Sequence, residues 1–554
     1  MDSSDLVFVP LGGVGEIGMN LALYGYGRPD KRAWIMTDCG VTFPDPRHPG
    51  VDLVMADVRF AVELGDNLKA MVITHAHEDH YGAILSLWPR FNVPVWCTPF
   101  TAGMLEAKAN EESGSPKVPV TVYRAGDKFS IGPFEIEALH VAHSIPEPVS
   151  LAITTPLGTV IHSGDWKIDA APTLGANTDA NAFQRHGEKG VLALICDSTN
   201  ATRTGASPTE QEVSDSLASI IEEAKGRVAI TTFSSNVGRI RSIALAAKKA
   251  GRRVMLMGRS ILRVCEVADG LGYLDGLDPF VEEDEFPSIN RRQLVIILTG
   301  SQGEDRAALA KLARDEHPRI HLTAGDLVVY SARAIPGNEK AINDTKNRLI
   351  EQGIDIITDD DALVHVSGHP RQNELEQMYS WVKPRVCVPV HGEAAHLVAH
   401  AALAASLGVP QVAPVRNGDI LRLAPGPAEI IGEAPHGRIY KDGHVIGTED
   451  DIGVGERRTL SYVGTVACSI VLDRSGRMAD DIDLAAFGLP KRTLAGEDFE
   501  DMLAEAAVAA VQSIPPGRRK NDELVAGAAE KAIRAAARDH WGKKPVVTVF
   551  VAIV

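Results

Sequence analysis

The sequence predicts an α/β protein in three parts: a first domain of short apolar strands, a second α/β domain inserted into it, and a small α/β domain at the C-terminal end. Three patterns indicate this arrangement. Strands that end in histidine or aspartate recur on both sides of a long interruption, strands and amphipathic helices alternate between about 210 and 365, and alanine-rich helices precede an apolar terminal strand. Alternating strands and helices are typical of an open parallel sheet covered by helices.

The long interruption sets the domain boundaries. Asp165 and His391 share the same strand-end pattern, but the stretch between them is too long for a loop, so it contains a domain of its own. Within it we expect helices at 237–250, 260–273, 304–315 and 338–352, each after an apolar strand. The boundaries that follow are 1–210 and 365–447 for the first domain, 211–364 for the inserted domain, 448–459 for a linker and 460–554 for the C-terminal domain.

The C-terminal domain ends on an apolar stretch, Val546 to Val554. We expect it to be a strand, preceded by helices at 499–513 and 522–538 and by another strand within 459–473. An exposed edge strand favours association with other chains. The terminal strand is therefore either paired inside its own domain or part of an oligomer contact.

The composition excludes several classes of protein. The chain has 554 residues, of which 45% are hydrophobic and 23% charged, which is ordinary for a globular protein. No apolar run approaches the roughly 20 residues of a membrane span, and the N-terminus lacks the pattern of a signal peptide. The cysteines form no Cys-x-x-Cys pair, which predicts reduced thiols and a cytoplasmic location. A net charge of −17 argues against a general electrostatic grip on nucleic acid, though a local site remains compatible with it.

A glycine-rich stretch near the N-terminus resembles a dinucleotide fingerprint. Gly13-Val-Gly15-Glu-Ile-Gly18 fits G-x-G-x-x-G, and Asp38 follows at a suitable distance. That motif requires a helix after the glycines, whereas the continuation from Asn20 to Gly27 alternates like a strand. We therefore predict two strands joined by a glycine-rich turn, and a nucleotide-dependent oxidoreductase is the disfavoured hypothesis.

The chemistry of the chain is concentrated at His75-Ala-His-Glu-Asp-His80, directly after a short apolar strand. Residues two apart in an extended loop point the same way, so His75 and His77 can bind one ion together. Asp79 and His80 lie at the start of a helix and can turn toward a second ion. Imidazole nitrogen and carboxylate oxygen are ligands that zinc and its neighbours accept.

Further candidate ligands follow other strands. His143, Asp165 and His391 each stand at or just after the end of an apolar strand, where side chains distant in sequence can converge. Together the seven candidate ligands are too many for one tetrahedral ion and suit two, with Asp165 as the bridge: His75, His77, Asp79, His80, His143, Asp165 and His391. The cofactor expected is a pair of divalent ions, Zn²⁺ first, with Mn²⁺ or Mg²⁺ as alternatives. Two such ions activate water for phosphodiester hydrolysis.

Other polar residues near these ligands receive supporting roles. Asp38 would orient a ligand histidine or the water, and His369 is a ligand, a helix cap or the acid that protonates the leaving oxygen. His140 and His162 lie inside strands, so we expect them behind the ligands or in the core. His396 and His400, four apart on one helix, we expect at the surface or in the core.

The turns that leave the inserted strands share hydroxyl, amide and glycine groups. Such groups either cap helices or contact phosphates at the carboxyl ends of the strands. Arg239, Arg259 and Arg333 stand beside the turns, and capping does not require guanidinium groups, so we favour contact with substrate. The candidates are Ser234, Ser235, Asn236, Arg259, Ser301 and Ser331.

The ordered motifs resemble a known family. Asp38, the His75–His80 loop, His143 and Asp165 look like the metallo-β-lactamase superfamily. The inserted domain, Ser367-Gly-His369 and Pro389-Val-His391 resemble its β-CASP nuclease branch. Together with Pro10-Leu-Gly-Gly-Val-Gly-Glu-Ile-Gly, Asp197-Ser-Thr-Asn and Thr299-Gly-Ser-Gln-Gly-Glu, the motifs are similar to those of the bacterial ribonuclease J family along nearly the whole chain.

The resemblance implies a metallo-β-lactamase αββα sandwich and a function. It implies a 5′-to-3′ exoribonuclease that prefers 5′-monophosphorylated RNA, also cuts internally, and acts in RNA maturation and decay. Single-stranded RNA would be the substrate, its phosphates bound by the strand–helix turns and by His365, Ser367, Gly368 and His369. Homodimers or homotetramers through the C-terminal domain, and other RNA-decay enzymes, would be the partners.

The sequence departs from the family pattern at positions beside the site rather than at ligands. Ala76 replaces a common glycine, Trp166 a frequent phenylalanine, and Asp305-Arg306 a usual Pro-Met. These changes concern substrate preference. Two alternatives stay open: a small-molecule metallohydrolase of the lactamase or glyoxalase type, against which the inserted domain and His391 count, and a non-catalytic RNA-degradation scaffold, which a missing ligand would support.

Overall fold

The computed structural model describes residues 4–335 and 337–554 and divides into two compact units. The first unit comprises Met1–Thr42 and Met55–Arg438, and the second comprises Phe43–Val54 and Ile439–Val554. Residues 439–447, which we assigned to the first domain, thus group with the C-terminal unit. The expected linker at 448–459 contains the first part of helix α13 (Val454–Val463).

The larger unit is built around two mixed β-sheets that pack face to face. Apolar side chains from both sheets, such as Phe8, Tyr24, Phe134 and Leu151, form one buried core between them. The first sheet has the order β24 (Glu429–Glu433), β23 (Asp419–Ala424), β1 (Asp5–Gly12), β3 (Leu21–Gly27), β4 (Ala33–Thr37), β7 (Leu68–Val72), β8 (Val95–Cys97) and β9 (Val120–Val122). The second has the order β10 (Lys128–Ile131), β11 (Phe134–His140), β12 (Val149–Thr155), β13 (Gly158–His162), β14 (Val191–Asp197), β20 (Val386–Val390) and β22 (Gln411–Val412).

Helices cover the outer faces of both sheets, which gives the αββα sandwich. Trp34 of β4 packs edge-on against Phe60 of α1 (Arg59–Glu63), with ring centroids 5.5 Å apart. On the other side a second apolar cluster joins the second sheet to its helices. Those helices are α5 (Ala180–Lys189), α11 (Gln372–Val382) and α12 (Ala394–Ser406).

The hairpin at the N-terminus shows which structure the glycine-rich motif adopts. Strands β1 and β3 pair antiparallel from Asp5↔Gly27 onward, and no helix follows Gly18. Gly13, Gly15 and Gly18 all adopt positive φ angles, which suits glycine in a tight turn. The prediction of two strands joined by a glycine-rich turn is confirmed, and the dinucleotide geometry is not formed.

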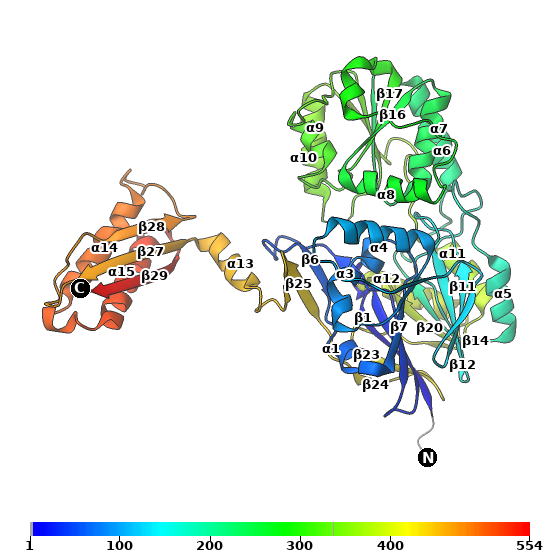
Figure 1. Ribbon diagram of the computed structural model, residues 1–554, viewed down its shortest axis with the longest axis horizontal. Coiled ribbons are helices and arrows are strands. Elements are labelled where there is room, and N and C mark those ends of the chain that lie inside the picture. Colours follow the sequence, from blue (N-terminus) through cyan, green and yellow to red (C-terminus); the bar gives the residue numbers. More distant parts are fainter. Residues whose placement is uncertain (1–3, 336) are drawn as a thin grey trace. The chain divides into compact units, whose positions relative to one another are not determined.

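The inserted domain is the predicted open parallel sheet, with helices on both faces (Figure 1). Its strand order is β16 (Arg253–Met257), β17 (Leu294–Leu298), β15 (Val228–Thr232), β18 (Leu327–Ser331) and β19 (Asp355–Ile357). The helices are α6 (Glu210–Glu223), α7 (Val237–Lys249), α8 (Arg259–Gly270), α9 (Ala308–Ala313) and α10 (Glu339–Glu351). Only α9 is much shorter than expected: residues 300–307 form turns, in which Gly300 and Gly303 have positive φ angles.

The C-terminal unit contains a sheet in the order β28 (Asp483–Phe487), β27 (Thr465–Leu472) and β29 (Val546–Ile553). Helices α14 (Phe499–Ser513) and α15 (Asp522–Trp541) bury one face of it. The terminal strand β29 pairs in parallel with β27 from Thr465↔Val546 to Leu472↔Ile553, and it lies at the edge of the sheet. Among the described residues, no helix has both the length and the apolar character needed to cross a membrane.

Candidate metal centre

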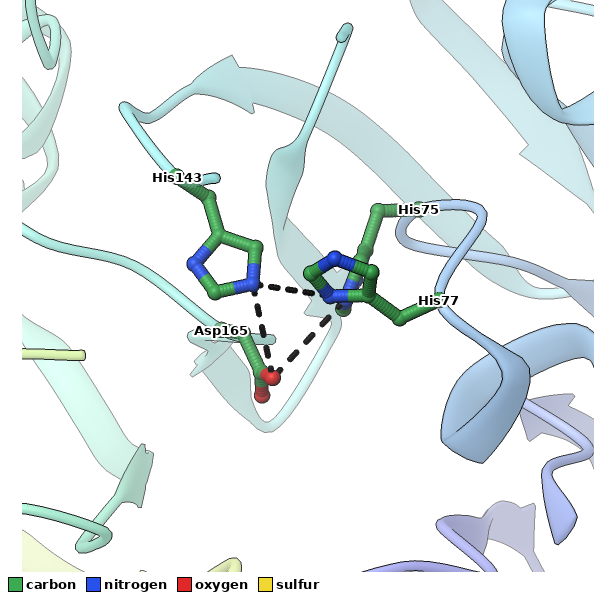
Figure 2. A group of neighbouring side chains, drawn as sticks. All are labelled: His75, His77, His143 and Asp165. Carbon is green, nitrogen blue, oxygen red and sulfur yellow. Dashed lines mark hydrogen bonds and ion pairs between the residues drawn. The ribbon is translucent and has the colours of Figure 1, made fainter. Parts of the chain in front are cut away.

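The side chains of four residues from three separate loops lie close together (Figure 2). His75 and His77 follow β7, His143 follows β11 and Asp165 follows β13. The Nδ1 atom of His77 lies 3.1 Å from His75 Nε2 and 3.0 Å from His143 Nε2. Asp165 Oδ2 lies 3.8 Å from His75 Nε2 and 3.7 Å from His143 Nε2. These atoms form the first ligand group.

A second group lies on the other side of the same carboxylate. Asp79 and His80 lie in the short helix α2 (Glu78–Tyr81), and His391 follows β20 with a positive φ of 51°. His391 Nε2 is 3.3 Å from Asp79 Oδ2 and 3.7 Å from Asp165 Oδ1, while His80 Nε2 is 3.2 Å from Asp165 Oδ2. The seven residues expected as ligands thus lie in two adjoining groups that share Asp165.

The arrangement fits two ions. Zinc bonds of 2.0–2.1 Å to nitrogen and oxygen in a tetrahedron place the ligand atoms about 3.3 Å apart, and the contacts between ligand atoms above lie near that value. The Oδ1 atom of Asp165 is buried and has no hydrogen-bond partner among the described residues. A buried carboxylate oxygen without a donor carries a large free-energy cost, which a cation would relieve.

Hydrogen bonds behind the ligands fix the orientation of His80. Its Nδ1 donates to Asp38 Oδ2 over 2.8 Å, which directs Nε2 toward Asp165. Asp38 Oδ1 also accepts the backbone N–H of Thr74 over 2.8 Å. Asp38 has a φ of 61°, unusual for a residue with a side chain. Backbone strain of this kind persists only where surrounding contacts hold it, and it is common at functional sites. The strain and the hydrogen bond to His80 together support the role of Asp38 in positioning that histidine.

The electrostatics differ between the two groups. Burial holds the pKa of His75 and of His143 well below the usual value and lowers that of His77 to about 4, so these imidazoles are neutral, the form that binds metals. Burial also acts to lower the pKa of His80, but the Asp165 carboxylate, among others, raises it well above the usual value. The second group therefore favours positive charge, which a cation supplies.

Asp197 is a site residue for which the sequence analysis gave no role. Its Oδ2 accepts a hydrogen bond from Nδ1 of His369 over 2.8 Å, and its Oδ1 lies 3.4 Å from Nδ1 of His391. Burial acts to lower the pKa of His369, but Asp197 and Asp165 raise it above the usual value. Asp197 ends the apolar strand β14, so the same strand-end pattern that identified the ligands could have identified it.

Asn20 is a second residue that the sequence did not indicate. Its Nδ2 lies 3.3 Å from Asp79 Oδ2 and 3.0 Å from His80 Nε2. The residue follows the glycine-rich turn and precedes β3, and nothing in its local sequence distinguishes it from an ordinary turn residue.

The loop at 365–369 lies against the ligands. Gly368 accepts a hydrogen bond at its carbonyl oxygen from Nδ1 of His143 over 2.7 Å. A Cβ atom at this glycine would lie 2.5 Å from the His143 ring, so only glycine allows this approach. Ser367 Oγ accepts from Asn200 Nδ2 over 2.9 Å, and His365 packs beside Phe233 at the start of the turn that follows β15.

The turn residues of the inserted domain differ in what they contact: some are near the ligands or exposed, and others bond within the inserted domain. Ser235 Oγ lies 3.0 Å from Nε2 of the ligand His77, next to half-buried Ser234, and Arg259 is exposed at the start of α8. Asn236 caps α7, because its side chain accepts the backbone N–H of Arg239.

Three residues expected to contact substrate are buried instead. Ser301 is 4% exposed, and Ser331 is fully buried, with its hydroxyl bonded to Arg239 Nη1 and to Val364 O. Arg239 is itself 1% exposed and forms an ion pair with Glu210. The expectation of substrate contact is therefore wrong for Arg239, because its guanidinium is used to join segments of the protein.

The remaining histidines support the structure around the site. Nδ1 of His162 and the Tyr24 hydroxyl lie 2.9 Å apart in a buried hydrogen bond, and burial raises the pKa of Tyr24 well above the usual value. His140 Nε2 donates to Ala176 O. His400 is fully buried between Ser198 and Tyr379.

The sandwich and the paired ligand groups at its strand ends define a metallo-hydrolase of the metallo-β-lactamase fold. The comparison with family models agrees: residues 28–181 match the beta-lactamase superfamily domain and residues 359–414 match the Zn-dependent metallo-hydrolase RNA specificity domain. Residues 225–349 match the ribonuclease J beta-CASP domain, and residues 452–554 match the ribonuclease J C-terminal domain.

Curated relatives specify the family. Ribonuclease J of Sinorhizobium meliloti is 60% identical over 547 residues, which cover 99% of this chain and 97% of that protein. Ribonuclease J of Thermus thermophilus is 36% identical, over 83% of this chain and 81% of that protein. The chain therefore belongs to the ribonuclease J family, and it is a metal-dependent ribonuclease.

A solved structure supports the fold alone. A protein of unknown function from Enterococcus faecalis V583 aligns with a TM-score of 0.50 at 17% identity, over 75% of this chain and 100% of that one. Membership of a ribonuclease family removes the small-molecule hydrolase, the non-catalytic scaffold and the oxidoreductase from the hypotheses.

Proposed function

We propose that this ribonuclease degrades 5′-monophosphorylated RNA from the 5′ end, also cuts RNA internally, and acts in RNA maturation and decay in the cytoplasm. One observation carries the mechanism: the buried Asp165 carboxylate belongs to both ligand groups. A carboxylate that belongs to two ligand groups would hold two ions close together, and two ions close together can stabilise both the attacking and the leaving oxygen of a phosphodiester.

Two divalent ions, Zn²⁺ in the first instance, would be held by the seven residues described above. His75, His77 and His143 would bind one ion, Asp79, His80 and His391 the other, and Asp165 both. Bound there, the ions would lower the pKa of a water molecule and stabilise the charge that develops on the phosphate during in-line attack.

The protein's own residues then orient groups and move a proton. Asp38 keeps the hydrogen of His80 on Nδ1, which leaves Nε2 directed at the site. Asp197 holds Nδ1 of His369 in the same way. His369 would carry its other proton on Nε2 and donate it to the leaving oxygen, a role that its raised pKa favours.

RNA phosphates would be bound where the inserted domain faces the ligands. Hydroxyls, amide groups and a guanidinium suit this task, because they can donate to phosphate oxygens. The proposed contacts are Ser234, Ser235, Arg259, His365, Ser367, His369 and the backbone of Gly368. Asn236, Ser301 and Ser331, whose side chains are buried, are not among them.

The C-terminal unit would form homodimers or homotetramers, and other RNA-decay enzymes would be further partners. The support is the open face and edge of its sheet, on which Phe487 is 66% exposed and Phe550 63% exposed. Exposed aromatic side chains on an edge strand favour pairing with another chain.

The test uses RNA of one sequence with a 5′-monophosphate or a 5′-triphosphate, labelled at its 5′ end. We expect rapid release of labelled mononucleotide from the monophosphate, and slower, internal cleavage of the triphosphate. EDTA and the His77→Ala substitution should each abolish both. Cleavage that persists in EDTA or in His77→Ala would exclude the metal mechanism, and equal release from both RNAs would exclude the end preference.

A further inference from the structure

One hydrogen bond joins the inserted domain to a metal ligand. Ser235 lies in the turn between β15 and α7, and its Oγ is 3.0 Å from Nε2 of His77, 158 positions away in the sequence. The hydroxyl therefore contacts the ligand on the side of the ring that faces away from the other ligands.

The direction of this hydrogen bond follows from the first ligand group. The His77 atom that meets His75 and His143 is Nδ1, so Nδ1 must carry the free electron pair that binds an ion. A neutral imidazole has one N–H and one acceptor nitrogen. The hydrogen of His77 is therefore on Nε2, which donates to the Ser235 hydroxyl.

Hydrogen bonds within the inserted domain and to its neighbouring segments hold the turn that carries Ser235 in place. Asn236 caps α7, and the backbone N–H of Val237 donates to Ser235 O. In the first turn of α7, Arg239 donates to Glu210 Oε2 and to Val364 O. A group that is fixed in this way can orient its neighbour, because little of its freedom remains to be lost on binding.

We propose that Ser235 is a positioning residue for His77, so that the inserted domain supplies part of the metal centre and not only the wall that receives RNA. The proposal rests on the proposed metal function. Partners of this kind fix the ring orientation and the position of the hydrogen on a ligand histidine, and their loss typically weakens metal binding 10–100-fold.

The experiment measures metal binding to the full chain without RNA. Co²⁺ is titrated into the chelator-treated protein, and its visible absorption and its competition with a chelating dye give the affinity of each site. Threonine and valine have nearly the same shape, and only threonine keeps the hydroxyl. We expect Ser235→Val and Ser235→Ala to weaken one Co²⁺ site about 10-fold or more and to alter its spectrum. We expect Ser235→Thr to keep the Co²⁺ affinity and the spectrum of the unsubstituted chain.

Two comparisons make the result decisive. Ser219→Ala, an identical chemical change on the exposed surface of α6, should leave Co²⁺ binding unchanged. Binding of uridine 5′-monophosphate to each variant is measured separately. If Ser235→Val binds Co²⁺ as tightly as Ser235→Thr does, the positioning role is overturned, even if the nucleotide binds less well. If the unsubstituted chain binds no Co²⁺, the proposed function itself fails.

Discussion

The ion pair between Glu210 and Arg239 is a buried link between α6 and α7. Arg239 Nε and Nη2 donate to Glu210 Oε2 over 3.1 and 2.7 Å, and the two side chains, Arg239 and Glu210, are 1% and 8% exposed. Substitution of Glu210 by alanine would leave the guanidinium buried without its carboxylate. Removal of one partner from such a pair costs about 3–5 kcal/mol, a large part of the roughly 5–15 kcal/mol that stabilises a typical domain.

Hydrogen exchange of peptides from α7 and β15 measures this cost locally. A loss of about 3 kcal/mol corresponds to more than about 100-fold faster exchange, since about 1.4 kcal/mol is a factor of ten. The matched control is Glu210→Leu with Arg239→Met, which removes both charges and should cost far less than Glu210→Ala. If exchange in α7 changes by less than about fivefold in Glu210→Ala, the pair does not hold the inserted domain as we argue.

Four further results follow from the structure. Asp38→Asn should weaken metal binding by about 10–100-fold, because an uncharged amide at this position cannot accept the His80 hydrogen in the same way; retention of the full metal content after dialysis would contradict this. His391→Ala should lower the metal content from the proposed two ions per chain to one, as measured by plasma mass spectrometry. Burial acts to raise the pKa of Glu210, but Arg239 and Lys167 hold it below the usual value, so its stabilising contribution is present above about pH 4.3 and is lost as the pH falls further; Glu210→Gln should unfold with a weaker dependence on acid pH. Phe550→Asp should shift the proposed oligomer toward monomer in light scattering, and an unchanged mass would show that this face does not form the oligomer contact.

The candidate ligands could be predicted from the sequence because each lies in a recognisable local pattern. A short apolar strand identifies a buried element, and the polar residues that follow it lie at the edge of the sheet. The pattern held for His143, Asp165 and His391, which the structure brings together with the His75–His80 loop. Asp197 lies in the same pattern, at the end of the apolar strand β14, although the sequence analysis gave it no role.

The residues that the sequence could not place depend on contacts between distant segments. The sequence favoured a phosphate contact for Arg239 because its neighbours in the sequence are those of an ordinary first helical turn, where an arginine is usually exposed. Its burial is decided by Glu210, 29 positions earlier, and by the chain returning at Val364. Asn20 shows the same limitation, since only the packing of its turn against α2 brings its amide to Asp79.

The order of the chain makes the two ligand groups unequal. His75, His77, His143 and Asp165 all precede the inserted domain, so the first group can assemble from one continuous part of the sequence. The second group requires His391, which reaches the site only when β20 pairs with β14, Asp197 lying opposite Val390. That pairing closes the chain around the inserted domain, whose Ser235 hydroxyl lies 3.0 Å from Nε2 of His77. The first group therefore depends on the inserted domain through one side-chain contact, whereas the second group depends on the return of the chain to the sandwich after that domain.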